Sequence, residues 1–171
     1  SFVQPEYQPS SGNRKAIFSL DNLWDGLGAL VVDHPEIKYF FGKVTMYLDF
    51  HKKGRDLILG FMDHFFKDKD QWICAKQPLE LHHDISYFIE KIKELDYKES
   101  YKILIKKLKE LNCSLPPLIA AYMNLSSSMK TFGTAMNSKF GDVEETGILI
   151  SIDDIYPEKK DRHINTYKKV K

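Results

Sequence analysis

The sequence predicts a mixed fold of the α/β (α+β) class, in which amphipathic helices accompany short apolar strands. Apolar residues recur at helical spacing from Arg14 to Val32, which predicts one helix that ends before Pro35 and packs its apolar face on a sheet. The segment 39–47 is rich in β-branched and aromatic residues and is too short for a typical helix, so it predicts a buried strand. The apolar run from Ile148 to Ile152 predicts a late strand.

The region between these two strands predicts further helices. Arg55 to Phe66 places its apolar residues on one side, as an amphipathic helix does. Lysine-rich stretches at 82–95 and 98–111 are strongly amphipathic and predict a helical pair. Pro116 and Pro117 mark the start of another helix, because proline is tolerated in the first turn, where its missing N–H would have no partner anyway.

The composition is that of one ordinary globular domain. The chain has 171 residues, and its 25 basic and 24 acidic residues nearly cancel, so no overall field favours binding to nucleic acid. Cys74 and Cys113 lie far apart without CxxC spacing or clustered histidine, which predicts reduced thiols and no metal site. The chain has neither the long apolar run of a membrane-spanning helix nor the features of a signal peptide at its first residues. We therefore expect a cytoplasmic protein.

The first candidate site is a polar loop that leads into the first helix. Such a junction directs several backbone N–H groups at one point, and the helix dipole favours an anion there, so the loop could hold a phosphate or pyrophosphate. Arg14 would add a charge-assisted contact. Many loops that contain Ser-Ser-Gly only join a strand to a helix, and this alternative stays open on the residues alone. The candidate binding residues are Gln8, Ser10, Ser11, Gly12, Asn13 and Arg14.

The second candidate is a tyrosine close to the double proline. Tyr122 follows Pro117 by roughly one and a half helical turns. A phenol placed near a thioester can protonate the departing thiolate as a general acid. A helical tyrosine is, however, more commonly a core residue with its hydroxyl at the edge.

The third candidate is the acidic segment 140–147, which contains Glu144 and Glu145. Its carboxylates could bind a metal or an amine, or act as a base, although a turn with solvated charges is the commoner meaning. The triplet His82-His83-Asp84 has the composition of a ligand group, but Asp84 is well suited to cap the helix that follows.

Short segments in order along the chain carry a family resemblance. The segments are Ser1–Tyr7, Leu20–Leu27, His34–Val44, Leu115–Tyr122 and Asn137–Phe140. The first two, SFVQPEY and LDNLWDGL, resemble the "GRS-x-V-x-PEYR" and "LLW-x-GI" of the hemolysin-like acyltransferases, which are relatives of the ornithine-lipid N-acyltransferases in the GNAT superfamily. HPEIKYFFGKV is similar to "HPEYRYLFGPVS" and LPPLIAAY to "PPLI-xx-Y", while NSKF stands where that family often has "DPDF".

The resemblance implies the C-terminal part of a GNAT-like acyltransferase fold, with residues 1–157 as a partial domain and 158–171 as a loose charged tail. The loop from Gln8 to Arg14 would follow the fourth strand and receive the donor's phosphate. Residues 49–112 would form a helical insertion between the fifth and sixth strands, shaping an apolar groove for a long acyl chain. On this alignment the first three strands would precede Ser1, so the fragment alone would have doubtful activity and an unpaired sheet edge would favour association with a partner or a second copy.

The resemblance also implies roles for single residues. Tyr122 would be the acid for the leaving thiolate, as in several enzymes of the superfamily that use a tyrosine in the helix after the fifth strand. Glu144 or Glu145 would supply a carboxylate for the amine proton. Gln8 replaces the family's usual arginine and Asn137 its usual aspartate, which puts the phosphate contacts and any carboxylate role at those positions in doubt.

The resemblance implies an enzyme that transfers a fatty acyl group to an amino acid amine, such as that of glycine, ornithine or lysine, and so forms an acyl-amino-acid lipid. The donor would be a thioester of acyl carrier protein (acyl-ACP) or of CoA (acyl-CoA), and no metal would be required. One alternative is a non-catalytic acyl- or membrane-binding module, because the lysine-rich stretches could contact anionic lipid peripherally at the inner membrane face. A second alternative is acetyl transfer to a small amine.

Overall fold

The computed structural model describes residues 19–168 and divides them into two compact units. Residues 39–154 form the larger unit, and residues 19–38 together with 155–168 form the smaller one. The larger unit combines one antiparallel sheet with helices, which confirms the predicted α+β class.

The sheet has three strands, β1 (Tyr39–Met46), β2 (Lys130–Asn137) and β3 (Val143–Ser151), in the order β1-β3-β2 with both pairings antiparallel. The predicted strands at 39–47 and 148–152 are thus confirmed, although β3 begins five residues earlier than expected. We did not predict β2. Its pairing is interrupted by a bulge between Thr131 and Thr134, where Gly133 has a φ of 81°, and this irregularity hides the alternation typical of a strand.

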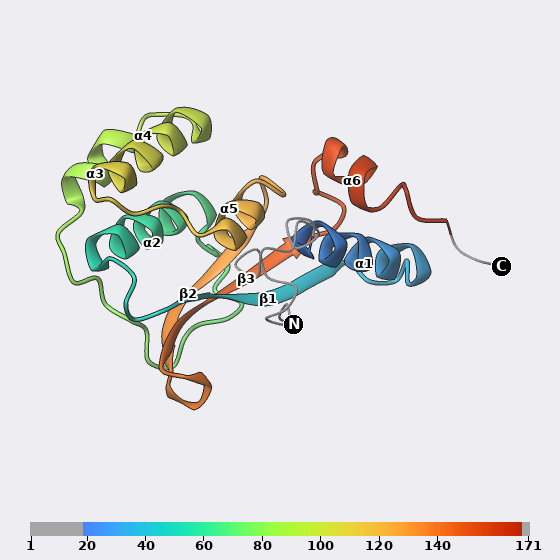
Figure 1. Ribbon diagram of the computed structural model, residues 1–171, viewed down its shortest axis with the longest axis horizontal. Helices are drawn as coiled ribbons and strands as arrows, with labels where there is room; N and C mark the ends of the chain where they lie inside the picture. Colours follow the sequence, from blue (N-terminus) through green and yellow to red (C-terminus); the bar gives the residue numbers. More distant parts are fainter. Residues whose placement is uncertain (1–18, 169–171) are drawn as a thin grey trace. The chain divides into compact units, whose positions relative to one another are not determined.

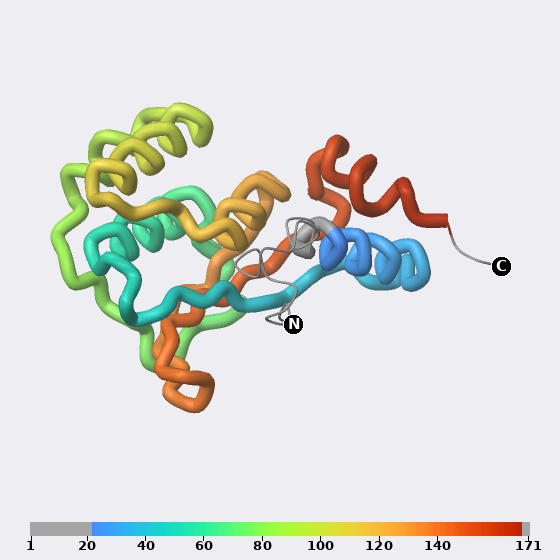
Figure 2. Tube along the Cα trace, in the orientation of Figure 1, coloured from blue at the N-terminus to red at the C-terminus, as the bar shows by residue number. Residues whose placement is uncertain are grey.

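Four helices lie in the long connection from β1 to β2 (Figure 2). They are α2 (Lys52–Phe66), α3 (Ser86–Ile92), α4 (Tyr97–Glu110) and α5 (Pro117–Met123). All four match predicted helices, and α3 is shorter than the 82–95 expected. Asp96 fixes the start of α4 because its carboxylate accepts a hydrogen bond from the Glu99 N–H at 2.8 Å, and Pro117 stands in the first turn of α5 as predicted.

The core of the larger unit lies between one face of the sheet and the helices, and Figure 1 shows α2, α3 and α4 on the same side of the sheet. Alternate residues of β3, including Ile148 and Ile150, are buried on that face. Phe61 of α2 is fully buried and packs against Tyr97 of α4 in a tilted arrangement, with 5.7 Å between ring centroids, which adds aromatic packing to the helix contact.

Strand β1 is less buried than the sequence predicts. Val44 and Met46 are buried, but Tyr39 and Phe41 are 52% and 58% exposed within the described part of the chain. The aromatic composition of 39–47 therefore predicts a strand correctly but predicts its burial wrongly. Side chains of a strand alternate between two faces, and the helices of the larger unit cover the face of Val44 and Met46.

The smaller unit contains α1 (Ser19–Asp33) and α6 (Pro157–His163), which contact each other. The predicted helix 14–32 is confirmed over its described part, whereas the loose tail expected from residue 158 begins with the ordered helix α6. His163 Nδ1 lies 2.8 Å from Asp25 Oδ1, and the Tyr167 hydroxyl donates to Asp33 Oδ2 at 3.2 Å. These polar contacts tie the C-terminal segment to α1.

Within residues 19–168, no helix is both long enough and apolar enough to cross a lipid bilayer.

Two glycines of α1 allow a matched test of this helix contact. A Cβ at Gly28 would lie 1.7 Å from the His163 carbonyl oxygen, whereas a Cβ at Gly26 would have no atom within 4 Å. Gly28→Ala should therefore lower the free energy of unfolding of the unit by about 1–3 kcal/mol through overpacking. Gly26→Ala should raise it by about 0.5–1 kcal/mol, because alanine favours the helix. Chemical denaturation of the two variants measures the difference, and equal stability would contradict the described α1–α6 contact.

Candidate functional site

The predicted phosphate loop lies outside the described residues. Gln8, Ser10, Ser11, Gly12, Asn13 and Arg14 all belong to the segment before residue 19. Their role in donor binding stays a prediction.

Tyr122 lies on α5, the short helix that begins at Pro117. Its side chain is half-buried. Burial raises the pKa of the Tyr122 hydroxyl above its ordinary value of 10.0, which makes the phenol a weaker acid in the absence of substrate. The phenol is protonated at neutral pH, as any tyrosine is, and its catalytic role stays a prediction.

Glu144 and Glu145 lie inside β3 and not in a solvated turn, so the commoner meaning that we gave to the acidic segment is wrong for these two residues. As neighbours in a strand, their side chains point to opposite faces of the sheet. The Glu144 side chain is only 2% exposed and the Glu145 side chain 12%. A joint role of the two carboxylates at one reacting centre is therefore excluded by the geometry of the strand.

Glu145 is held by two donors on its face of the sheet. Lys43 Nζ of β1 lies 2.5 Å from Glu145 Oε2, and Asn137 Nδ2 of β2 donates to the same oxygen at 2.9 Å. Desolvation raises the pKa of Glu145, but the hydrogen bonds from Lys43 and Asn137 outweigh it and bring the pKa below its ordinary value. Glu145 is therefore ionised at neutral pH and is a weak base.

Glu144 belongs to a buried cluster that the sequence did not predict. Arg55 Nη1 of α2 donates to Glu144 Oε1 at 2.8 Å, and Lys52 Nζ lies 3.9 Å from the same oxygen. The other carboxylate oxygen, Oε2, is buried and has no hydrogen-bond partner among the described residues. Since Arg55 is itself only 1% exposed, this ion pair fastens the first turns of α2 to β3 away from water.

Asp56 is the third charged residue of the cluster, and it binds the loop at His82 and His83 to α2. Arg55 Nε and Nη2 donate to Asp56 Oδ1 at 2.9 and 2.5 Å. Asp56 Oδ2 accepts from the backbone N–H groups of His82 and His83 at 3.0 and 2.8 Å and lies 2.8 Å from His83 Nδ1. Desolvation raises the pKa of Asp56, but the hydrogen bonds from His83 and Arg55, together with the charge of Arg55, outweigh it and lower the pKa below its ordinary value of 3.8.

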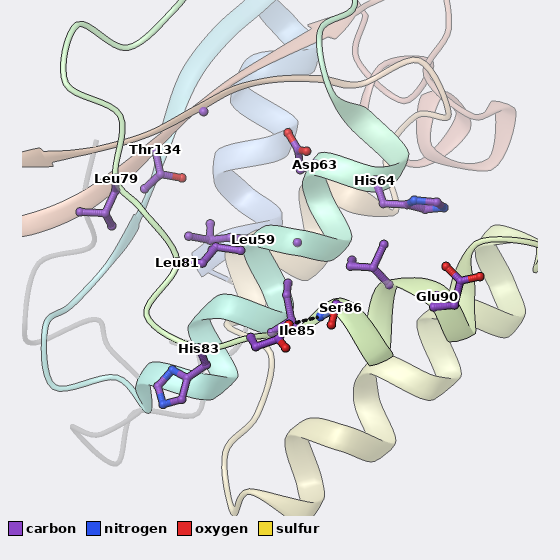
Figure 3. Close-up of a pocket in the computed structure, with 14 residues that line it drawn as sticks. Leu59, Asp63, His64, Leu79, Leu81, His83, Ile85, Ser86, Glu90 and Thr134 are labelled. Atoms are coloured by element: carbon purple, nitrogen blue, oxygen red, sulfur yellow. Dashed lines mark hydrogen bonds between the residues drawn. The ribbon is translucent and has the colours of Figure 1, made fainter.

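A cavity of about 680 Å³ lies beside this loop (Figure 3). It is bounded by α2, α3, the segment 79–86 and the bulge of β2. In the view of Figure 3, Leu59, Leu79 and Leu81 lie toward Thr134, whereas His64 and Glu90 lie on the other side. This volume falls within the roughly 300–1,000 Å³ of pockets that bind small molecules. The cavity is therefore the candidate binding site of the larger unit.

The triplet His82-His83-Asp84 stabilises the segment 79–86, which forms one wall of the cavity. Asp84 Oδ1 accepts a hydrogen bond at 2.8 Å from the N–H of Ser86, the first residue of α3, but the N-cap position is occupied by Ile85, so Asp84 stands one residue before the predicted cap. His82 and His83 contact Asp56 as described above. Across residues 19–168, no group of three or more His, Cys, Asp or Glu side chains is arranged to hold a metal ion.

A signal for the buried cluster was present in the sequence. Arg55 and Asp56 stand at the start of a predicted amphipathic helix, and Arg55 precedes the core residue Ile58 by three positions. A charged residue at such spacing shares a face with the apolar residues and requires a partner if it is buried. We predicted only the apolar side of this helix, because the sequence alone does not show that α2 is covered on nearly all sides.

Comparison with known proteins gives two relatives that match nearly the whole chain. A protein of Phocaeicola vulgatus named "Glycine N(alpha)-acyltransferase" is 50% identical over 169 residues, which are 99% of this chain and 52% of that protein. A protein of Bacteroides thetaiotaomicron with the same name is 49% identical over 167 residues, 98% of this chain and 50% of its own length. The chain thus spans about half the length of the curated relatives it matches. No family model matches the chain, and no solved structure matches it.

Removal of the central guanidinium tests the cluster. Arg55→Met deprives two buried carboxylates of the guanidinium that they share, so it should lower the free energy of unfolding by about 3–5 kcal/mol. Lys43→Met removes an ion pair whose lysine side chain is 51% exposed, so it should change stability only slightly. Denaturant unfolding of both variants gives the comparison. Equal stability of the two variants would show that the Arg55 cluster does not hold α2 to the sheet.

Proposed function

We propose that this chain is part of an N-acyltransferase that transfers an acyl group from a thioester to the amine of glycine. The observation that carries the proposal is the identity of 50% and 49% to two proteins named glycine N(alpha)-acyltransferase, over nearly all of this chain. Because the chain spans about half of each relative, the activity is assigned to the protein that contains this chain at full length.

The proposed donor is a fatty acyl thioester of acyl carrier protein or CoA, and the proposed product an acyl-amino-acid lipid, as the hemolysin-like and ornithine-lipid branch of the superfamily implies. One surface of α4 supports an anionic donor. Lys98, Lys102, Lys106 and Lys109 are exposed and follow one another at helical spacing, so they present positive charge along one stripe. A cytoplasmic reaction, with peripheral contact at the inner membrane face, fits a lipid product.

The proposed mechanism begins with the glycine amine. The ammonium group first loses a proton to water, since Glu144 is closed off by Arg55, and Glu145, which is ionised and held by Lys43 and Asn137, is a weak base. The amine nitrogen then attacks the thioester carbonyl carbon and loses its second proton to water, the C–S bond breaks, and the thiolate takes a proton. Tyr122 is the proposed donor of that proton, as the family resemblance of Leu115–Tyr122 implies.

A direct assay tests the proposal. The full-length protein is incubated with acetyl, octanoyl and palmitoyl thioesters of CoA and of acyl carrier protein, with glycine, ornithine, lysine or no amine. We expect thiol release that depends on glycine and is fastest with the long chain, and mass spectrometry should detect N-acylglycine. Fastest release with the acetyl donor would instead support a short-chain acetyltransferase. Absence of amine-dependent release with every donor, together with binding to anionic liposomes, would support a non-catalytic membrane-binding module.

Tyr122→Phe tests the acid in that reaction. The variant keeps the ring and loses the proton, so kcat should fall by about 100-fold or more with little change in KM for glycine. Tyr101→Phe is a matched control, because Tyr101 is a half-buried helical tyrosine on α4. If both variants turn over at the same rate, the thiolate proton comes from another group.

A further inference from the structure

The cavity beside α2 has an apolar wall built from separate parts of the chain. Leu59 belongs to α2, Leu79 and Leu81 to the connecting segment, and Ile85 and Ile89 to α3 and its start. Leu59 and Ile85 are buried, whereas Leu81 is 44% exposed. Apolar side chains that converge on a hollow from three elements are the usual lining of a site for an apolar ligand.

The charged groups at the cavity restrict what it can bind. Asp63, Asp84 and Glu90 line it, and no lysine or arginine of the described residues does. The imidazole of His83 is held by Asp56, and Figure 3 shows this ring turned away from Leu59 and Leu81. A phosphate or a carboxylate would therefore meet repulsion here, and a neutral apolar group would not.

The walls of the cavity are fixed by contacts that do not depend on a ligand. The Leu79 N–H donates to the Thr134 carbonyl oxygen at 2.8 Å, so the connecting segment is joined to β2. Asp56 holds the same segment at His82 and His83. At the floor, Gly60 of α2 permits close approach of α3, because a Cβ there would lie 2.2 Å from Ile85 Cδ1. The hollow is thus preformed, which favours binding because little ordering is required.

We propose that this cavity binds the hydrocarbon chain of the fatty acyl donor and so determines which acyl length the enzyme accepts. The inference rests on the proposed function, because acyl transfer supplies the apolar ligand. The thioester head and its phosphate lie outside the cavity, since the acidic residues disfavour both the donor's phosphate and the carboxylate of glycine. Leu81, at the exposed part of the wall, is the residue whose size limits the space available to the chain.

Acyl-length profiles of two tryptophan variants test the assignment. Leu81→Trp fills the cavity, and Leu48→Trp is the matched control, because Leu48 is 40% exposed and does not line the cavity. The full-length protein is assayed with glycine and with C4 to C16 acyl-CoA donors. Leu81→Trp should lower kcat/KM for the C16 donor by about tenfold or more, the ratio expected when about two methylene groups lose their burial. For the C4 donor, Leu81→Trp and the control Leu48→Trp should have the same kcat/KM.

A binding measurement separates this inference from the proposed function. The fluorescent methyl ester of cis-parinaric acid is a neutral acyl probe that needs no turnover. It should bind the wild type and Leu48→Trp equally, and Leu81→Trp about tenfold more weakly, as for two lost methylene contacts. If transfer fails with every donor but the probe shows this pattern, the cavity assignment stands and the proposed reaction falls. If transfer occurs and Leu81→Trp matches Leu48→Trp in both measurements, the cavity assignment is overturned and the reaction stands.

The variant Leu81→Ala tests the cavity independently, in case Leu81→Trp does not fold. It removes apolar wall without adding bulk at a partly exposed position, so the fold should be kept. Binding of the probe should weaken severalfold if the wall contacts the chain. Unchanged binding of the probe to Leu81→Ala would contradict a hydrocarbon chain in this cavity.

Discussion

One guanidinium between two buried carboxylates organises the larger unit. Arg55 reaches Glu144 on the sheet through Nη1 and its own neighbour Asp56 through Nε and Nη2. Because a buried ion is costly without an opposite charge beside it, each charged side chain of the cluster depends on its partners. The cluster therefore fixes the position of α2 relative to β3. Asp56 extends this order to the loop at His82 and His83. The position of the cavity wall therefore depends on a cation that never contacts the cavity itself.

The two adjacent glutamates of β3, Glu144 and Glu145, have separate roles. Two adjacent glutamates in a strand cannot serve one centre, since one faces the helices and the other the opposite side of the sheet. Glu144 stabilises the fold through its ion pair with Arg55. Glu145 is ionised and held by Lys43 and Asn137, so it is suited to contact an amine more than to remove a proton completely.

Helices α1 to α5 and two of the three strands were predictable, because their periodic apolar residues and the prolines at the start of α5 act locally. The charged segment of α6 has no such apolar period, and we expected a loose tail there. Strand β2 was not, since the bulge at Gly133 breaks its alternation. The buried cluster joins Arg55 to a residue 89 positions away, and no local pattern shows that pairing. The cavity likewise takes its lining from distant segments, so the resemblance could suggest an apolar groove in 49–112 but not its walls.

The central claim is that this fixed cavity holds the acyl chain of a thioester donor. A crystal structure of the full-length protein with a palmitoyl thioether analogue of CoA tests it most directly. We expect the hydrocarbon chain to contact Leu59, Leu81 and Ile89, with the phosphates outside the cavity. A chain bound elsewhere, with the cavity filled by another part of the protein, would contradict it.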